Sequence, residues 1–227
     1  MTHRPPLTQI IQQLTGISLF AELDQPTLRE LAQASRWREY EAGEVVVFEG
    51  DTHSGLYYLQ YGWLKVVKTS ASGREQILRF LEPGETFNEI GVFANQMNPA
   101  TAIALEPAGI WLIQRAVLTR LFAERPEFAQ NVITKMAERM LYLVSLITDL
   151  SLRPVVGRLA RLLLEDAVGD VLDRPRWYTQ AELAARLGTV PDVVQRALRT
   201  LESDGLIAAD RHQIRVLDRA SLADIAS

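Results

Sequence analysis

The residues best suited to do chemistry lie near the C-terminal end of the chain, where polar side chains recur at helical spacing. Between Thr189 and Gly205 the apolar positions fall on one helix face, and Asp192, Gln195 and Arg196 fall on the other. Arginine can donate two hydrogen bonds to guanine, glutamine can bond adenine, and aspartate can accept from the cytosine amino group. This set predicts the direct reading of base edges in the DNA major groove.

Other polar residues nearby are suited to the phosphate backbone, which positions a protein on DNA without specifying sequence. We expect this role for Thr179, Gln180, Arg186, Arg199, Arg211 and His212. The alternative is a small helical domain whose arginine and glutamine side chains are merely solvated. The elements that carry these residues decide between the two interpretations.

Two capped helices separated by a turn are predicted here. Thr179, followed three residues later by Glu182, forms a capping box, and Gly188 ends the helix that it starts. Thr189 and Asp192 repeat the arrangement and predict a second N-terminus. A helix-turn-helix follows from this order.

The residues after the second helix predict a wing. Gly205 ends the helix, and LIAADRHQIRVLD reads as two short strands with Arg211 and His212 at their tip. Upstream, LRPVVGRLARLLLEDA is typical of an amphipathic helix, and VGDVLDRPR is predicted to be a loop.

A long helix is predicted before this domain, after a first helix over residues 115–124 and a start at Pro126. Its apolar positions recur at gaps of three and four, the spacing of a coiled-coil seam, at Ile133, Met136, Met140, Leu143, Ile147 and Leu150. We expect this stripe to be a dimer seam. The alternative is a helix packed on its own domain.

The first half of the chain predicts helices followed by an antiparallel jelly roll. Asp24 is the expected N-cap of a helix with Pro26 in its first turn, and short β-prone runs punctuated by glycine and proline fill residues 36–114. The expected fold class is α+β. Its parts are helices and a sensor roll over 1–114, a dimerisation helix region over 115–150 and a winged helix-turn-helix over 151–227.

Composition is compatible with DNA binding but does not indicate it. The 227 residues are 48% hydrophobic and carry a net charge of −4, and from Ser151 onward 11 arginines balance 11 acidic residues. DNA contact must therefore come from a local cluster. No signal peptide or membrane span is recognisable, so we expect a cytoplasmic protein without a membrane partner.

The order of these elements resembles the CRP/FNR regulators over nearly the whole chain. The most specific stretches are FEGD with LYY at residues 48–58, FNEIGVF at 87–93, GRLARLLL at 157–164 and the unit from Gly188 to Leu201. The resemblance implies a homodimer on two-fold symmetric double-stranded DNA that also contacts RNA polymerase. It places Arg196 at a base-contacting position. Pro191 stands where many members have arginine, so the preferred half-site is expected to differ.

The resemblance also implies an effector pocket, which is degenerate in this chain. It places Asn88, Glu89, Ile90 and Gly91 on a short helix that holds a cyclic nucleotide, with Glu89 on the ribose. Pro99 and Ala100 replace the phosphate-binding Arg-Ser pair, and Leu143 and Val144 replace the adenine-contacting Thr-Ser pair. We therefore do not expect cyclic AMP binding, unless Arg115 or another basic residue substitutes. Glu89 could instead be structural, capping the short helix or bonding a neighbouring strand.

Other chemistries find little support. Cysteine is absent, which excludes an iron–sulfur cluster on cysteine ligands, and His3, His53 and His212 are scattered rather than clustered for haem or a cupin metal. We expect no enzyme activity, no metal and no cofactor, with the effector unknown.

The leading hypothesis is a homodimeric, sequence-specific transcription regulator that is independent of cyclic AMP and active without ligand. An effector-gated regulator that senses another small molecule and a small-molecule-binding dimer without a DNA role remain alternatives. A cupin-type enzyme ranks third.

Overall fold

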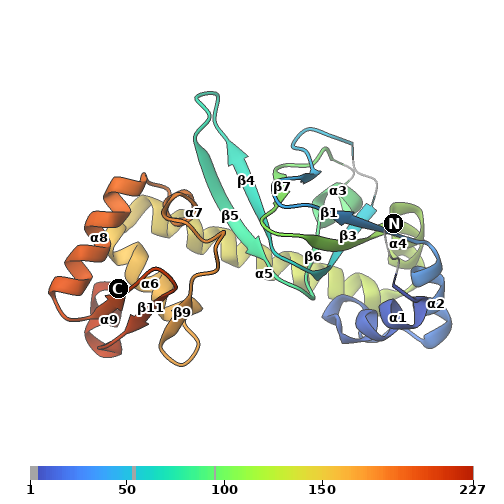
Figure 1. The fold of residues 1–227 in the computed structure, drawn as a ribbon. Helices are drawn as coiled ribbons and strands as arrows, with labels where there is room; N and C mark the ends of the chain where they lie inside the picture. The colour runs from blue at the N-terminus through green and yellow to red at the C-terminus, as the bar shows by residue number, and fades with distance from the viewer. Residues whose placement is uncertain (1–4, 53–54, 95, 227) are drawn as a thin grey trace. The chain divides into compact units, whose positions relative to one another are not determined.

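The computed structural model describes residues 5–52, 55–94 and 96–226, and His3 and His53 lie outside them. Figure 1 shows the elements along the chain. Contacts divide the chain into two compact units, Met1–Lys68 with Arg79–Tyr142 and Thr69–Leu78 with Leu143–Ser227. No helix of the described part is long and apolar enough to cross a bilayer.

The first unit begins with helices α1 (Leu7–Gly16), η1 (Ser18–Phe20) and α2 (Gln25–Gln33). Asp24 is the N-cap of α2, as predicted, and its carboxylate accepts from the backbone N–H of Thr27 at 2.9 Å. Such a cap contributes about 1 kcal/mol. Phe20 packs in this layer and stacks on Phe128 with ring centroids 5.9 Å apart.

Two four-stranded antiparallel sheets follow, which confirms the predicted roll. One has the order β1-β8-β3-β6 and the other β2-β7-β4-β5. Their bounds are β1 Ser35–Tyr40, β2 Val45–Val47, β3 Gly55–Tyr61, β4 Leu64–Thr69, β5 Glu75–Leu81, β6 Thr86–Phe87, β7 Thr101–Ala104 and β8 Ala108–Gln114. Tyr40, Leu59, Leu64 and Ile110 belong to one buried cluster drawn from both sheets. Each fully buried large side chain stabilises the fold by about 1.5–3 kcal/mol.

Short helix α3 (Glu89–Phe93) follows β6, and helices α4 (Arg115–Glu124) and α5 (Pro126–Leu152) follow the roll. The predicted break at Pro126 is confirmed, because proline fits the first turn of a helix but not its interior. Helix α5 has 27 residues. Its first turns pack through Phe128 and Val132 into a second buried cluster, which the N-terminal helices, α4 and strands β3 and β8 share. Much of the remaining helix is exposed.

The second unit contains the predicted winged helix-turn-helix and two elements that were not predicted. Helices α6 (Val155–Asp166), α7 (Gln180–Arg186) and α8 (Pro191–Ser203) precede strands β10 (Ile207–Ala209) and β11 (Gln213–Val216). The prediction of a plain loop over 168–176 was wrong, because β9 (Val171–Asp173) pairs with β11. A further helix, α9 (Arg219–Ala226), packs on α6.

Candidate functional site

The helix-turn-helix is built from local signals that the structure bears out in part. Thr179 caps α7 by accepting from the backbone N–H of Glu182 at 3.3 Å. Gly188 has φ +65°, a left-handed conformation that only glycine adopts cheaply, and it forms the turn. The second capping box was wrong: Val190 is the N-cap of α8 and no side chain caps it. Pro191 occupies the first turn and sets this start.

Helix α8 presents a polar face opposite a buried one. Val194, Ala197, Leu198 and Leu201 are buried against the unit's core. Asp192, Arg196 and Arg199 are exposed, and Gln195 is half-buried. The Arg196 Nε–H reaches the carbonyl oxygen of Asp192 at 3.4 Å, a long contact that leaves the guanidinium NH₂ groups at the surface.

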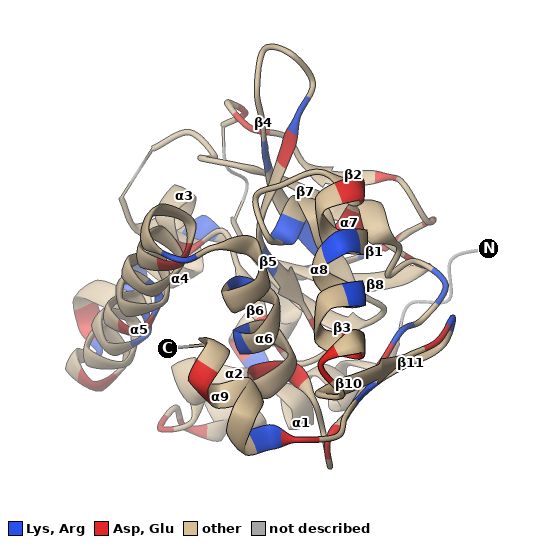
Figure 2. Ribbon diagram, turned by 90° about the vertical axis from the view of Figure 1, so that its left-hand side faces the viewer, with Lys and Arg blue, Asp and Glu red and all other residues tan. Residues whose placement is uncertain are grey.

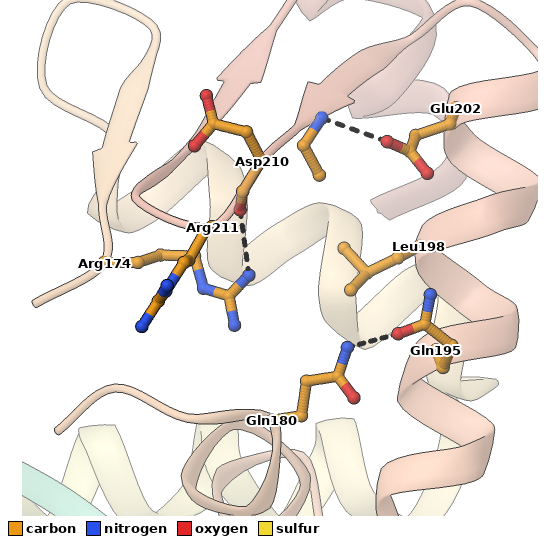
Figure 3. Close-up of a pocket in the computed structure, with 8 residues that line it drawn as sticks. Arg174, Gln180, Gln195, Leu198, Glu202, Asp210 and Arg211 are labelled. Carbon is orange, nitrogen blue, oxygen red and sulfur yellow. Dashed lines mark hydrogen bonds between the residues drawn. The ribbon is translucent and has the colours of Figure 1, made fainter. Parts of the chain in front are cut away.

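A hollow of about 350 Å³ lies between α8 and the wing. Figure 3 shows its lining, which comes from α7, α8, the wing and the segment before α7. Its residues are Arg174, Gln180, Gln195, Leu198, Glu202, Ala209, Asp210 and Arg211.

Hydrogen bonds around this hollow join α8 to α7 and to the wing, and join the wing to the segment before α7. The Gln180 amide donates to the Gln195 side-chain oxygen, and Glu202 accepts from the backbone N–H of Ala209 at 3.1 Å. Arg174 donates to the carbonyl oxygen of Asp210 at 3.3 Å. The groove beside α8 is therefore polar, and its walls are held by contacts within the unit.

Both basic and acidic residues lie on α8 and around the wing (Figure 2). Arg211 and His212 are exposed between β10 and β11. Asp210 orders this turn, because its carboxylate accepts from the backbone N–H groups of His212 and Gln213 at 2.7 and 2.8 Å. The two side chains at the wing tip are thus presented on a fixed turn.

Arg186 occupies a different environment from the other predicted phosphate contacts. Its guanidinium forms a two-point ion pair with Asp166 on α6, and it also lies 3.4 Å from the Tyr178 hydroxyl. The Tyr178 pKa is raised, chiefly by burial. Arg186 therefore holds α7 against α6 in this structure.

The effector region of the roll centres on Glu89, which is 1% exposed. One carboxylate oxygen accepts from the Thr86 hydroxyl at 2.8 Å, and the other pairs with Arg139 on α5. Arg139 also donates to the carbonyl oxygen of Thr86 at 2.6 Å. Glu89 thus links β6 and α5, in keeping with the structural role left open by the sequence.

The remaining pocket residues of this unit lie around α3 and β7. Asn88 has φ +75° and donates to the carbonyl oxygen of Gly55 at 3.0 Å. Gly91 and Ala100 are buried, whereas Ile90 and Pro99 are exposed. The Lys68 ammonium donates to the Pro99 carbonyl at 3.0 Å, and the Arg115 Nε–H donates to the Val92 carbonyl at 3.0 Å.

The apolar stripe on α5 is largely exposed in the single chain. Ile133, Met140 and Ile147 are 62%, 66% and 63% exposed, and Leu143 and Val144 are exposed as well. Met136 packs partly against the buried cluster that contains Phe128 and Val132. Leu150 is half-buried and reaches the turn at Gly188, where an added Cβ would lie 2.5 Å from its Cδ2.

Known protein families contain domains that match both parts of this chain. Residues 37–125 match the cyclic nucleotide-binding domain, and residues 157–225 match the Crp-like helix-turn-helix domain. The chain belongs to the CRP/FNR family of transcription regulators. CRP/FNR members are regulators and not enzymes.

Individual CRP/FNR relatives are distant but cover most of the chain. The CRP-like cAMP-activated global transcriptional regulator of Mycobacterium tuberculosis is 24% identical, covering 92% of this chain and 96% of its own. The cyclic AMP receptor protein of Thermus thermophilus is 27% identical over 83% and 87%. The structure of FixK2 from Bradyrhizobium japonicum superposes with a TM-score of 0.76 at 21% identity, covering 85% and 98%, which supports the fold.

Sequence reasoning missed three arginines of this CRP/FNR chain. Arg174 was assigned to a loop, although its position before the capped helix at Thr179 could have suggested a place beside the wing. Arg79 and Arg139 meet at Thr86 from two elements 60 residues apart in the sequence. No local pattern indicates that meeting.

Proposed function

We propose that this regulator is a cytoplasmic homodimer that binds a two-fold symmetric site in double-stranded DNA, and that its DNA binding does not require cyclic AMP. The observation that carries the DNA-binding part is the exposed face of α8, beside a polar groove and an ordered wing. Family membership adds RNA polymerase as a further partner. The same proposal divides the chain into a sensor part over residues 1–114, a dimerisation helix region over 115–150 and a DNA-binding part over 151–227.

The proposed base-reading residues are Asp192, Gln195 and Arg196. Arg196 and Asp192 are exposed on the first turns of α8, the part of a recognition helix that meets base edges. Gln195 is bonded to Gln180, so it must exchange that hydrogen bond for one to a base. Arginine on guanine is the strongest element of this set.

The proposed phosphate contacts are Thr179, Gln180, Arg199, Arg211 and His212, at the start of α7, on α8 and on the wing. We give Arg186 a positioning role, because its charge is already paired with Asp166. Such contacts fix the register of the protein on DNA and make its affinity depend on salt.

The proposed dimer seam is the largely exposed apolar stripe of α5. It is formed by Ile133, Met136, Met140, Leu143 and Ile147, with Leu150 at its end. Large apolar side chains repeated on one exposed helix face are costly in water and are typical of an interface. A parallel pair of such helices would relate two copies of α8 by a two-fold axis. Two recognition helices then enter successive major grooves.

Independence from cyclic AMP is supported by the pocket residues. Pro99 and Ala100 cannot supply the charged hydrogen bonds that a buried cyclic phosphate needs, each worth about 1.5–3 kcal/mol. The two curated relatives above are named for cyclic AMP, so this chain is proposed to differ from them at these positions.

The test is anisotropy binding of the full-length protein to a palindrome selected from random DNA, with and without cyclic AMP. We expect tight, salt-dependent binding that cyclic AMP leaves unchanged. Binding that appears only with cyclic AMP would overturn the ligand part of the proposal. Absence of any specific site under both conditions would favour one of the two alternatives, a regulator gated by another small molecule or a dimer without a DNA role.

A further inference from the structure

The arginines of the C-terminal unit fall into two groups. One group is paired with carboxylates of the same unit, and it includes Arg161, Arg186 and Arg219. The other group makes no ion pair among the described residues, and it includes Arg174, Arg176, Arg196, Arg199, Arg211 and Arg215. Unpaired arginines that gather on one part of a domain are the electrostatic footprint of a nucleic-acid interface. The unpaired group therefore indicates where DNA phosphates are met.

Two of the unpaired arginines lie in the segment between β9 and α7. Arg174 directly follows β9, and its backbone N–H donates to the carbonyl oxygen of His212 at 2.6 Å. This bond continues the pairing of β9 with β11 by one residue and brings Arg174 beside the wing turn. Its guanidinium donates to the Asp210 carbonyl oxygen at 3.3 Å, so its charge has no carboxylate partner among the described residues. Arg174 and Arg211 both line the hollow beside α8 (Figure 3).

Arg176 lies on the turn that follows. The backbone N–H of Tyr178 donates to the carbonyl oxygen of Pro175 at 2.8 Å and closes this turn. Arg176 is exposed on it and makes no hydrogen bond or ion pair among the described residues. Three residues later Thr179 caps α7. Along the chain, Arg176 therefore stands between the wing and the start of α7, which both carry proposed phosphate contacts.

Two carboxylates near this segment oppose an anion. The Asp210 carboxylate accepts from two backbone N–H groups of the wing turn, at 2.7 and 2.8 Å, which offsets part of its charge. Asp173, at the end of β9, is exposed, and its carboxylate has no such partner among the described residues. The cations that face them are Arg174, Arg176 and Arg211. The balance is positive, and Asp173 is the group that reduces it most.

We propose that the segment 174–176 is a further contact to the DNA backbone, in which Arg174 and Arg176 each donate to a phosphate group. The segment joins the contacts proposed on the wing to those proposed at the start of α7. Its target is the backbone rather than base edges, because α8 is the element that enters the groove and this segment lies beside it. Guanidinium groups match phosphate by donating two parallel hydrogen bonds. This inference rests on the proposed function, since it adds contacts to the same DNA interface.

The experiment replaces single phosphates of the selected palindrome by uncharged methylphosphonates, one position at a time, and measures anisotropy binding of the full-length protein. For the wild type, each contacted phosphate should show a loss of affinity of about threefold or more. Arg174→Gln and Arg176→Gln should each abolish the loss at one position of the half-site, because that phosphate no longer has its partner. Losses that persist at every position in both variants would overturn the inference.

Two further variants set the sign and the background. Asp173→Asn should tighten DNA binding several-fold, because it removes a negative charge beside Arg174 and keeps the backbone pairing of β9. A structural defect does not strengthen binding. Arg219→Gln is the matched control, since Arg219 is an exposed arginine of the same unit that pairs with Asp170, and it should retain every loss. Unchanged affinity in both Asp173→Asn and Arg176→Gln would overturn the inference and leave these residues to a protein partner.

The outcomes separate this inference from a structural effect and from the proposed function. Arg174 also bonds the wing, so a loosened wing is a second explanation for weaker binding by Arg174→Gln. Arg176 makes no such bond among the described residues, so Arg176→Gln should keep the wild-type unfolding midpoint, and its methylphosphonate pattern then decides. If the wild type binds no palindrome, the proposed function fails and this inference with it. A bound palindrome with the same methylphosphonate pattern in all variants overturns this inference alone.

Discussion

At the scale of single residues, two arginines of α8 are exposed three positions apart, yet they are proposed to do different work. Arg196 is proposed to read a base, and Arg199, about one turn further along the helix, is proposed to contact a phosphate. A base contact changes sequence preference, whereas a phosphate contact changes affinity for all sequences alike. Substitution of each residue therefore has its own signature.

Arg196→Ala should weaken binding to the selected palindrome by about 1–3 kcal/mol and relax preference at one base pair of each half-site. The effect arises because guanine O6 and N7 lose their bidentate partner. Anisotropy against single-base variants of the site measures it. An unchanged preference would show that Arg196 does not read the base, and sedimentation should show the same oligomeric state as the wild type.

Arg199→Ala should weaken specific and non-specific binding by similar factors. It should also reduce the slope of log affinity against log salt by about one unit for each phosphate group that the protein no longer neutralises. Binding measured at several chloride concentrations gives that slope. A changed base preference with an unchanged slope would contradict the assignment to phosphate.

At the scale of elements, the turn of the helix-turn-helix depends on one glycine. Gly188 has positive φ, and a Cβ there would meet the Leu150 side chain at 2.5 Å and the Gln76 Oε1 at 2.9 Å. A side chain at this position would therefore destabilise the fold in two ways, through backbone strain and through crowding by its neighbours.

Gly188→Ala should destabilise the C-terminal unit by about 1–2 kcal/mol from backbone strain alone, with crowding adding to it. Denaturant unfolding followed by circular dichroism measures the change. Gly169→Ala is the control, because Gly169 also has positive φ but open space around a Cβ. Equal destabilisation in the two variants would show that crowding at Gly188 contributes nothing.

Helix α5 carries the apolar stripe that is proposed to be the dimer seam. Met140→Glu should dissociate the proposed dimer, because a charged carboxylate would be buried in an apolar seam. Sedimentation velocity across a concentration series gives the oligomeric state. Glu138→Ala is the control, since Glu138 is exposed and pairs with Lys135 on the same helix. A dimer that persists in Met140→Glu would place the seam elsewhere.

At the scale of the whole molecule, symmetry is proposed to determine which DNA is bound. A single α8 contacts a few base pairs, and two copies related by a two-fold axis read two half-sites about one helical turn apart. Affinity then depends on the spacing of the half-sites as much as on their sequence.

Inserting five base pairs between the half-sites should reduce affinity to that of a single half-site, because half a helical turn moves the second half-site to the opposite side of the DNA. Inserting ten base pairs is the control for DNA length, since a full helical turn returns the second half-site to the same side of the DNA. Anisotropy on the three sites compares them. Equal affinity for the native and five-base-pair-expanded sites would argue against a rigid two-fold reader.

Much of the architecture followed from short-range patterns in the sequence. Asp24 and Thr179 cap the helices that they were predicted to cap, Pro126 begins α5, and glycine and proline separate the strands of the roll. These signals act within a few residues, so they can be recognised in the sequence without knowledge of tertiary contacts. The cap at Thr189 failed because Pro191 defined the start of α8 one residue later.

The sequence by itself thus determined the order of the elements apart from β9 and α9, the polar face of α8, and the presence of Pro99 where the CRP/FNR resemblance implies a phosphate-binding arginine. Tertiary structure decided the rest. Strand β9 forms because it pairs with the edge of β11, and Arg186 forms an ion pair with Asp166. Arg79 and Arg139 both donate to the carbonyl oxygen of Thr86. Each of these depends on a partner 20 or more residues away. Helix periodicity and turn preferences act locally, whereas ion pairs and strand edges exist only once distant segments pack together.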